Sequence, residues 1–187
     1  MKTTLEKTHF KLDKKKFAEL LLYVARKSQK DPTFGATKLN KLLFFCDFQA
    51  YLQLGRPITG ADYRKLDHGP VPCPLPEIRE ELENKQDAIL VQEKYFNHPQ
   101  KRLFALRDPD LSEFSGAEIA IVDEMIDIFR EMDGTGISDF SHFSIGYQMV
   151  GYGETIPYEA AFISPPFPLD EGEIRRAHEL AKKHGWK

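Results

Sequence analysis

The chain has 187 residues, of which 41% are hydrophobic and 29% charged. This is enough for one domain with a core of its own, without disulfide staples. The formal net charge of −3 counts against nucleic acid as the main partner, although a local basic patch stays open. No signal-peptide-like segment and no apolar run of membrane-spanning length is present, so we expect a cytoplasmic protein with no membrane partner. Cys46 and Cys73 lack zinc-site spacing, so we expect reduced thiols, no metal site and no cofactor.

Helix signals dominate the first third of the chain. A first helix is predicted after Asp13, which is a preferred N-cap residue. Its apolar stripe has the spacing i, i+3, i+4, i+7, at Phe17, Leu20, Leu21 and Val24. A second helix is predicted from near Thr37 to before Gly55. Apolar residues cover nearly its whole circumference, so it should be the buried central helix.

The ten residues Tyr63–Pro72, which follow this helix, form a segment that we call the strap. Proline fixes φ and disfavours helix at the residue before it, so Gly69-Pro70 and Val71-Pro72 predict a stiff, extended conformation. The strap also contains Asp67 next to His68. Neighbouring side chains point in divergent directions, which argues against a catalytic pair.

The chain after the strap alternates helix and strand signals. Pro76 suits the first position of a third helix. Two β-rich segments, Ala88–Tyr95 and Lys101–Leu106, predict a hairpin joined through residues 97–100. Ser115 with Glu118 forms a capping box that opens a fourth helix.

Three further elements are predicted before the C-terminus. Gly134 and Gly136 are expected to end the fourth helix, and Ser138 to cap a fifth that runs through Met149. The stretch 151–168 predicts an ordered loop with at most a short helix, and a final helix follows at 170–184. The elements together predict one α+β domain over residues 1–187. It is mainly helical, with five to six helices around a buried central helix and one β-hairpin.

Catalytic motifs are absent from the sequence. There is no HExxH, GxSxG, Walker or GxGxxG pattern, and no nucleophile, base and orienting group are placed together. We therefore expect no catalytic residues and a protein that is not an enzyme. A hydrolase or nucleotide-binding enzyme without a recognisable motif is the remaining enzymatic alternative.

A winged-helix-like DNA-binding regulator is a second alternative, because a hairpin follows the helices. Lys94, Lys101 and Arg102 would then give phosphate contacts from the hairpin, and Lys38 and Lys41 from the helix. The acidic residues between 77 and 83 would repel phosphate, so a structural or protein-contacting hairpin is favoured.

Aromatic residues in loops and at element ends favour protein recognition, because aromatic side chains are enriched in interface cores. These are Tyr63, Phe96, Phe143, Tyr147, Tyr152, Tyr158, Phe162 and Phe167. The alternative for each of them is packing of its loop onto the body.

Several segments, read in order over about residues 17–163, resemble the Panacea domain, the SocA-like antitoxin domain of toxin–antitoxin systems. They are Lys38–Asp47 (KLNKLLFFCD), Gly55–Ile58 (GRPI), His68–Pro72 (HGPVP), Ile137–His142 (ISDFSH) and Gly153–Tyr158 (GETIPY). The ordered set, more than any one segment, carries the resemblance.

The resemblance implies a non-enzymatic protein that binds and neutralises a protein toxin in a bacterial or prophage setting. It also implies a second route, in which the antitoxin acts as an adaptor that presents the toxin to an AAA+ protease. We expect the strap and two loop tyrosines to shape the binding face: Tyr63, His68, Gly69, Pro70, Val71, Pro72, Tyr152 and Tyr158.

Five motif residues are expected to have a structural role: Lys38, Leu42, Asp47, Ser141 and His142. Asp47 matches a recurrent aspartate of the family's central helix. A carboxylate among aromatic residues must be paired, hydrogen-bonded or protonated. We expect Asp47 to accept hydrogen bonds from the strap backbone at residues 69–71.

Overall fold

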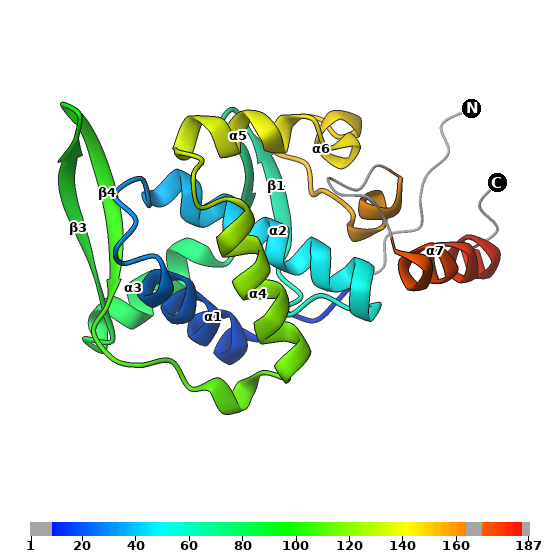
Figure 1. Ribbon diagram of the computed structural model, residues 1–187, viewed down its shortest axis with the longest axis horizontal. Helices are drawn as coiled ribbons and strands as arrows, with labels where there is room; N and C mark the ends of the chain where they lie inside the picture. Colours follow the sequence, from blue (N-terminus) through cyan, green and yellow to red (C-terminus); the bar gives the residue numbers. More distant parts are fainter. Residues whose placement is uncertain (1–8, 164–169, 185–187) are drawn as a thin grey trace.

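The computed structural model describes residues 9–163 and 170–184 (Figure 1). Helices predominate in these residues, and the strands form two separate two-stranded antiparallel sheets. The mainly helical α+β class predicted from the sequence is therefore confirmed. Within the described residues there are seven α-helices and two hairpins, against the five to six helices and single hairpin predicted.

Two helices begin the fold, and hairpins and helices then alternate through the middle of the chain. The helices are α1 (Lys14–Lys27), α2 (Ala36–Leu54), α3 (Leu75–Asn84), α4 (Gly116–Ile128), α5 (Gly134–His142), α6 (Ile145–Met149) and α7 (Glu171–His184). The strands are β1 (Tyr63–Leu66), β2 (Gly69–Pro72), β3 (Ala88–Tyr95) and β4 (His98–Ala105). Two 3₁₀ helices, η1 (Leu111–Glu113) and η2 (Tyr158–Phe162), lie in the connections.

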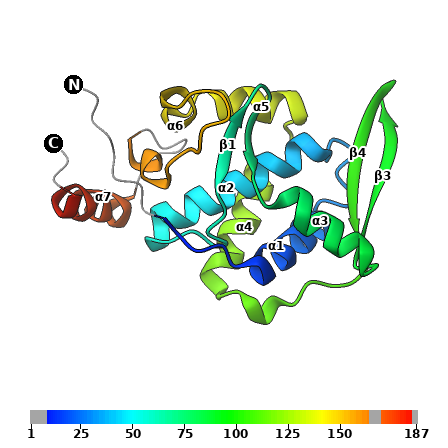
Figure 2. The ribbon, with the colours of Figure 1, turned by 180° about the vertical axis from the view of Figure 1, so that it is seen from behind.

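Helix α2 is the centre of the molecule, as predicted. Fourteen of its nineteen residues are buried, and it packs against α1, α4, α5, α7, β2, β4 and η2. Figures 1 and 2 show it from opposite sides, with the β1–β2 hairpin against one side and α4 crossing the other. It ends at Gly55, which adopts φ 73°, the left-handed conformation that favours glycine.

Local capping signals place several helix starts where the sequence predicts them. The Asp13 side chain accepts a hydrogen bond from the Lys16 amide at the start of α1. Ser115 and Glu118 form the predicted reciprocal capping box of α4. Asp170 and Glu173 bond each other's backbone amides in the same way at α7.

The predicted boundaries between the fourth and fifth helices are wrong. Helix α4 ends at Ile128, and Gly134 and Gly136 lie in the first turn of α5. Asp133 caps α5 by accepting from the Gly136 amide at 2.8 Å, so a strong N-cap begins a helix where the glycines alone indicate an end.

The expected single helix from Ser138 to Met149 is also wrong, because the chain breaks after α5. Ser144 then caps a separate short helix, α6, and its hydroxyl accepts from the Tyr147 amide. Ser138 itself lies inside α5 rather than at its start.

The β3–β4 hairpin is confirmed, but its second strand starts three residues earlier than predicted. Tyr95 pairs with His98. Phe96 and Asn97 both have positive φ, 43° and 64°, which lets the chain reverse in two residues. Figure 1 shows this hairpin at one end of the molecule, with α7 at the other.

The loop that begins at Gly151 contains the short helix η2 in its described part, as predicted. The part of the predicted loop at 164–169, with Phe167, lies outside the described residues. Among the helices that the structure describes, none combines the length and apolarity needed to cross a membrane.

Candidate functional site

The strap is extended, as predicted, and forms the antiparallel β1–β2 hairpin with its turn at Asp67-His68. Residues 153–156 run along the free edge of β1. The Gly153 amide donates to the Lys65 carbonyl at 2.8 Å, and the Ile156 amide donates to the Tyr63 carbonyl at 2.8 Å. The hairpin is therefore flanked by a third extended segment, which fixes β1 between β2 and this loop.

Side chains from α2, α5 and α6 hold the strap turn. Lys41 Nζ donates to the Pro70 carbonyl at 3.0 Å. Ser138 Oγ donates to the His68 carbonyl at 2.8 Å, and Tyr147 Oη to the Leu66 carbonyl at 2.8 Å. Three carbonyls around the turn are thus bound by side chains from three different helices, which preorganises the turn.

Gly69 is required by this close approach. Its φ of +90° is in the range that L side chains rarely adopt. A Cβ added to it would lie 2.4 Å from Ser141 Oγ and 2.6 Å from Lys41 Cε. Helices α2 and α5 therefore pack directly against the strap backbone at this residue.

Asp47 does not bind the strap backbone at residues 69–71, so that prediction is wrong. Its side chain accepts from the Thr59 amide at 2.8 Å, from the Thr59 hydroxyl and from Tyr63 Oη at 2.7 Å. Burial raises the pKa of Asp47, and the hydrogen bonds from Thr59 and Tyr63 oppose that rise. Asp47 therefore fixes the loop that leads into the strap, while Lys41 holds the strap turn.

Lys41 is the most unusual charge of the site. Its side chain is buried, with 1% of the residue exposed, and among the described residues it makes no ion pair within 4 Å. Burial lowers its pKa to about 7. Burying an ammonium group costs free energy unless the group is hydrogen-bonded, and the bond that the structure shows is the one to the strap.

The other buried lysine, Lys38, is fully partnered. Its ammonium group donates to Asp31 at 2.6 Å, to the Thr33 hydroxyl at 3.0 Å and to the Arg130 carbonyl at 2.9 Å. In the winged-helix alternative Lys38 and Lys41 would contact phosphate. Both ammonium groups are instead turned into the protein, which counts against that alternative.

The predicted binding residues divide into a surface set and a core set. His68 and Tyr152 are exposed, Tyr152 to 69%, and Val71 is half-buried. Tyr63 and Tyr158, at 1% and 5% exposure, belong instead to the core around Asp47, so their expected place on the binding face is wrong. The Tyr158 hydroxyl donates to the Ala61 carbonyl at 2.6 Å, so this ring packs the loop onto α2.

Gly69, Pro70 and Pro72 are also buried, so they support the strap from inside and do not face a partner. Because residues 153–156 pair along β1, exposed Tyr152 lies near the strap turn, where His68 is exposed as well. Of the other loop aromatics, Phe96 and Phe143 are exposed, to 80% and 74%.

The remaining motif residues lie at the junction of α2 with α5. Leu42 and Ser141 are buried, and the Ser141 hydroxyl donates to the Ser138 carbonyl at 2.6 Å. The His142 ring stacks on Tyr147, with 4.7 Å between ring centroids. Burial and the nearby charge of Lys41 lower the pKa of His142.

Sequence reasoning missed three residues that hold the strap: Lys41, Ser138 and Tyr147. For Lys41 a signal was present, since a lysine on an otherwise buried helix must find a polar partner inside the fold. Ser138 was expected to be a helix cap, and Tyr147 lies on the short helix α6 that was not predicted.

The described residues do not assemble a metal site. Within them, no group of three or more histidine, cysteine, aspartate or glutamate side chains is placed to hold an ion. Both cysteines are free thiols, and Cys46 is buried among the aromatic residues of α2. The polar groups of this site bind backbone carbonyls, which makes it a rigid support for a surface.

Comparison with known proteins identifies the family. The model of the antitoxin SocA-like Panacea domain matches residues 39–144, which is more than half of the chain. The chain belongs to this family. The match covers α2 from Leu39 onward, the strap and α5, and so contains the strap together with Lys41 and Ser138. No curated protein and no solved structure matches the chain.

Proposed function

We propose that this protein is a non-enzymatic, cytoplasmic antitoxin that binds a protein toxin and neutralises it by covering its active surface. The observation that carries the proposal is the match of residues 39–144 to the SocA-like antitoxin domain. The fixed strap supports it, because a surface that is already ordered loses less conformational entropy on binding.

The exposed part of the strap is the candidate contact. His68 at the strap turn and Tyr152 in the loop that pairs along β1 present a polar ring and an aromatic ring, and Tyr side chains are enriched in binding hot spots. The backbone around both is held by hydrogen bonds to α5, α6 and the loop 153–156.

The test is co-expression of the chain with the protein encoded by the neighbouring open reading frame. We expect the neighbour alone to stop growth and this chain to restore it. A neighbour that is harmless alone, or growth that the chain does not restore, would contradict the proposal.

The double variant His68→Ala with Tyr152→Ala then tests the contact surface. It should lose rescue while keeping the wild-type melting temperature, since both side chains are exposed. His98→Ala with Phe96→Ala, on the tip of the distant β3–β4 hairpin, is the matched control and should still rescue.

The lifetime of the toxin distinguishes a protease-adaptor role from direct covering of the toxin. If the chain delivers the toxin to an AAA+ protease, the toxin's half-life should fall in the presence of the chain, and rescue should require the protease. A toxin that is neutralised with an unchanged half-life supports direct covering.

A further inference from the structure

The last residue of α5, His142, packs against the tyrosine that bonds α6 to the strap. Its ring stacks on Tyr147, with 4.7 Å between ring centroids and 19° between the ring planes. The Tyr147 hydroxyl donates to the Leu66 carbonyl at 2.8 Å, directly before the turn at Asp67-His68. A single side chain therefore connects the His142 ring to the backbone of the strap turn.

One ring nitrogen of His142 is buried without a polar neighbour. Nε2 is covered by the protein and makes no hydrogen bond to any of the described residues. Buried polar atoms nearly always have a partner, so an atom without one requires a physical reason. A neutral imidazole can carry its proton on the other nitrogen, whereas an imidazolium has N–H donors on both. The described residues therefore accommodate the neutral ring and offer Nε2 no acceptor when the ring is charged.

The charged groups around the ring mostly oppose its protonation. Three positive or titratable side chains act on it from α2 and the strap: Lys41, Lys65 and His68. Asp139, on α5 itself, acts in the opposite direction. Lys38 and Asp47, the other charged residues of α2, are bonded to other parts of the fold. Strand β2 has no titratable side chain, and α6 has only the Tyr147 phenol, with Asp67 of the strap near it.

Two charges would meet if the ring were protonated in place. Burial and the charge of Lys41 lower the pKa of His142 below its ordinary 6.5, so the ring is uncharged at neutral pH. Lys41 has a pKa of about 7, so it is charged in acid before the ring is. The dipole of α5 favours a cation at this end, but the Gln148 amide already donates to the His142 carbonyl there, at 3.2 Å.

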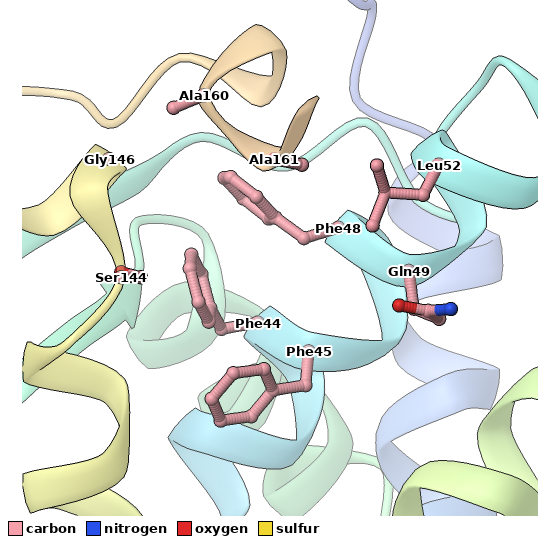
Figure 3. A pocket seen from close by; sticks show the side chains of 9 residues that line it. All are labelled: Phe44, Phe45, Phe48, Gln49, Leu52, Ser144, Gly146, Ala160 and Ala161. Carbon is pink, nitrogen blue, oxygen red and sulfur yellow. The ribbon is translucent and has the colours of Figure 1, made fainter. Parts of the chain in front are cut away.

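Helix α6 is held on its other side, so the ring is the part of this support that can move. Gly146 of α6 lines one small space with Phe44 of α2 and Ala160 of η2 (Figure 3). A Cβ added to Gly146 would lie 2.8 Å from the Cβ of Ala160, which shows how closely α6 packs there. His142, by contrast, is only half-buried and ends its helix. Its ring can therefore turn outward into water without moving α6.

We propose that protonation of His142 opens the strap turn. A proton from solvent binds the imidazole, the charged ring leaves Tyr147 for water, and Tyr147 then no longer holds the Leu66 carbonyl in place. At neutral pH the ring is uncharged and the turn stays ordered. This inference rests on the proposed function in one respect, since the surface that opens is the one assigned to the toxin.

Proton linkage sets the largest effect that one histidine can have. In the closed turn the ring resists protonation, whereas the ring released into water binds a proton with the ordinary pKa of 6.5. Lowering the pH therefore favours the open turn. At pH 5.5, one unit below 6.5, the ratio of open to closed turn should exceed that at pH 7.5 by up to about tenfold.

Hydrogen–deuterium exchange of the full chain measures this opening. Exchange rates at pH 7.5 and 5.5 are each divided by the rates of an unstructured chain at the same pH. Amides of residues 63–69 should lose up to about tenfold of their protection at pH 5.5. Amides of the β3–β4 hairpin are the internal reference and should keep theirs. The NMR titration of the His142 ring should have the same midpoint as the loss of protection.

Two variants assign the effect to one histidine. His142→Phe keeps an aromatic ring on Tyr147 but cannot take up a proton, so residues 63–69 should keep their protection at pH 5.5. His68→Ala removes the exposed histidine of the same turn and should lose protection as the wild type does.

Three results would overturn the proposal: protection of the strap that stays constant while the ring titrates, a loss that persists in His142→Phe, or a loss that His68→Ala abolishes. If His142→Phe does not fold, the wild-type titration decides, because different midpoints for the ring and the strap reject the proposal. These measurements use the chain alone. Failure here is therefore distinguishable from failure of the antitoxin proposal, which growth rescue tests.

Discussion

Replacing Asp47 with alanine removes the acceptor at the centre of a buried hydrogen-bond cluster. The carboxylate is fully buried and accepts from the Thr59 amide, the Thr59 hydroxyl and Tyr63 Oη. The donors differ in whether another acceptor is within reach once the carboxylate is removed. Tyr63 Oη also lies 2.9 Å from the Leu43 carbonyl, so it keeps an acceptor.

The loss of stability in Asp47→Ala therefore comes mainly from Thr59. Its amide loses the carboxylate that it donates to and stays buried, at a cost of about 1–3 kcal/mol. Loss of the hydroxyl bond adds about 1 kcal/mol, so we expect a total of about 2–4 kcal/mol. For a chain of this length, each kcal/mol lowers the melting temperature by about 2–4 °C.

Thermal and urea denaturation measure this loss, and Asp62→Ala is the matched control. Asp62 is an exposed carboxylate in the same loop, so its removal should change stability by less than about 0.5 kcal/mol. If Asp47→Ala has the same melting temperature as Asp62→Ala, the reasoning is refuted, because the Thr59 amide would then have found another partner.

The remaining predictions concern the strap and one buried ion pair. Lys41 has a folded pKa of about 7 against an ordinary value of 10.5, so between these pH values the unfolded chain binds one more proton than the folded protein. The free energy of unfolding, measured in urea, should therefore rise from pH 7 to 10 by up to about 4 kcal/mol. Lys41→Met should abolish this rise. Gly69→Ala should lower the free energy of unfolding by about 2–4 kcal/mol in the same assay. Gly153 has a similar φ but open space around it, so Gly153→Ala should cost only about 1–2 kcal/mol. Equal losses of stability would contradict the close approach of α2 and α5 to the strap backbone. The hydrogen bond from Arg107 lowers the pKa of Glu19 in the folded protein, so this ion pair stabilises the fold above the unfolded pKa of 4.5 and loses its effect as the pH falls through the folded pKa. Glu19→Gln should therefore reduce the loss of stability at acid pH. A variant whose stability falls with pH as steeply as that of the wild type would contradict this prediction.

Features determined by neighbours in the chain were predictable. The capping box of Ser115 with Glu118, the N-cap Asp13 and the C-terminal Gly55 each depend on residues within one helical turn. The burial of α2 was also predictable, because apolar residues surround it on all sides. These local signals were enough for the fold class and for most helix starts.

Features that depend on competing local signals were not predictable in the same way. Gly134 and Gly136 are typical of a helix end, but Asp133 supplies an N-cap and α5 begins there. At the β3–β4 turn, Phe96 adopts a positive φ that is uncommon for a bulky residue, and no sequence signal indicates it.

The candidate site required contacts across long stretches of the chain. Asp47 was correctly expected to need hydrogen bonds, but its partners lie 12 and 16 residues away and outside the strap turn. The bonds of Ser138 and Tyr147 to the strap span 70 and 81 residues. Burial of Tyr63 and Tyr158 likewise depends on how the loops fold back onto α2, which the aromatic content of a loop does not determine.

The buried residues that support the strap and the exposed residues around its turn differ in how freely they can change. A substitution at Gly69 or Lys41 alters a packed, buried contact, so the support tolerates little variation. His68 and Tyr152 are exposed, so their exchange costs little stability. We therefore expect the buried strap support to preserve the fold, and the exposed residues around its turn to select the partner.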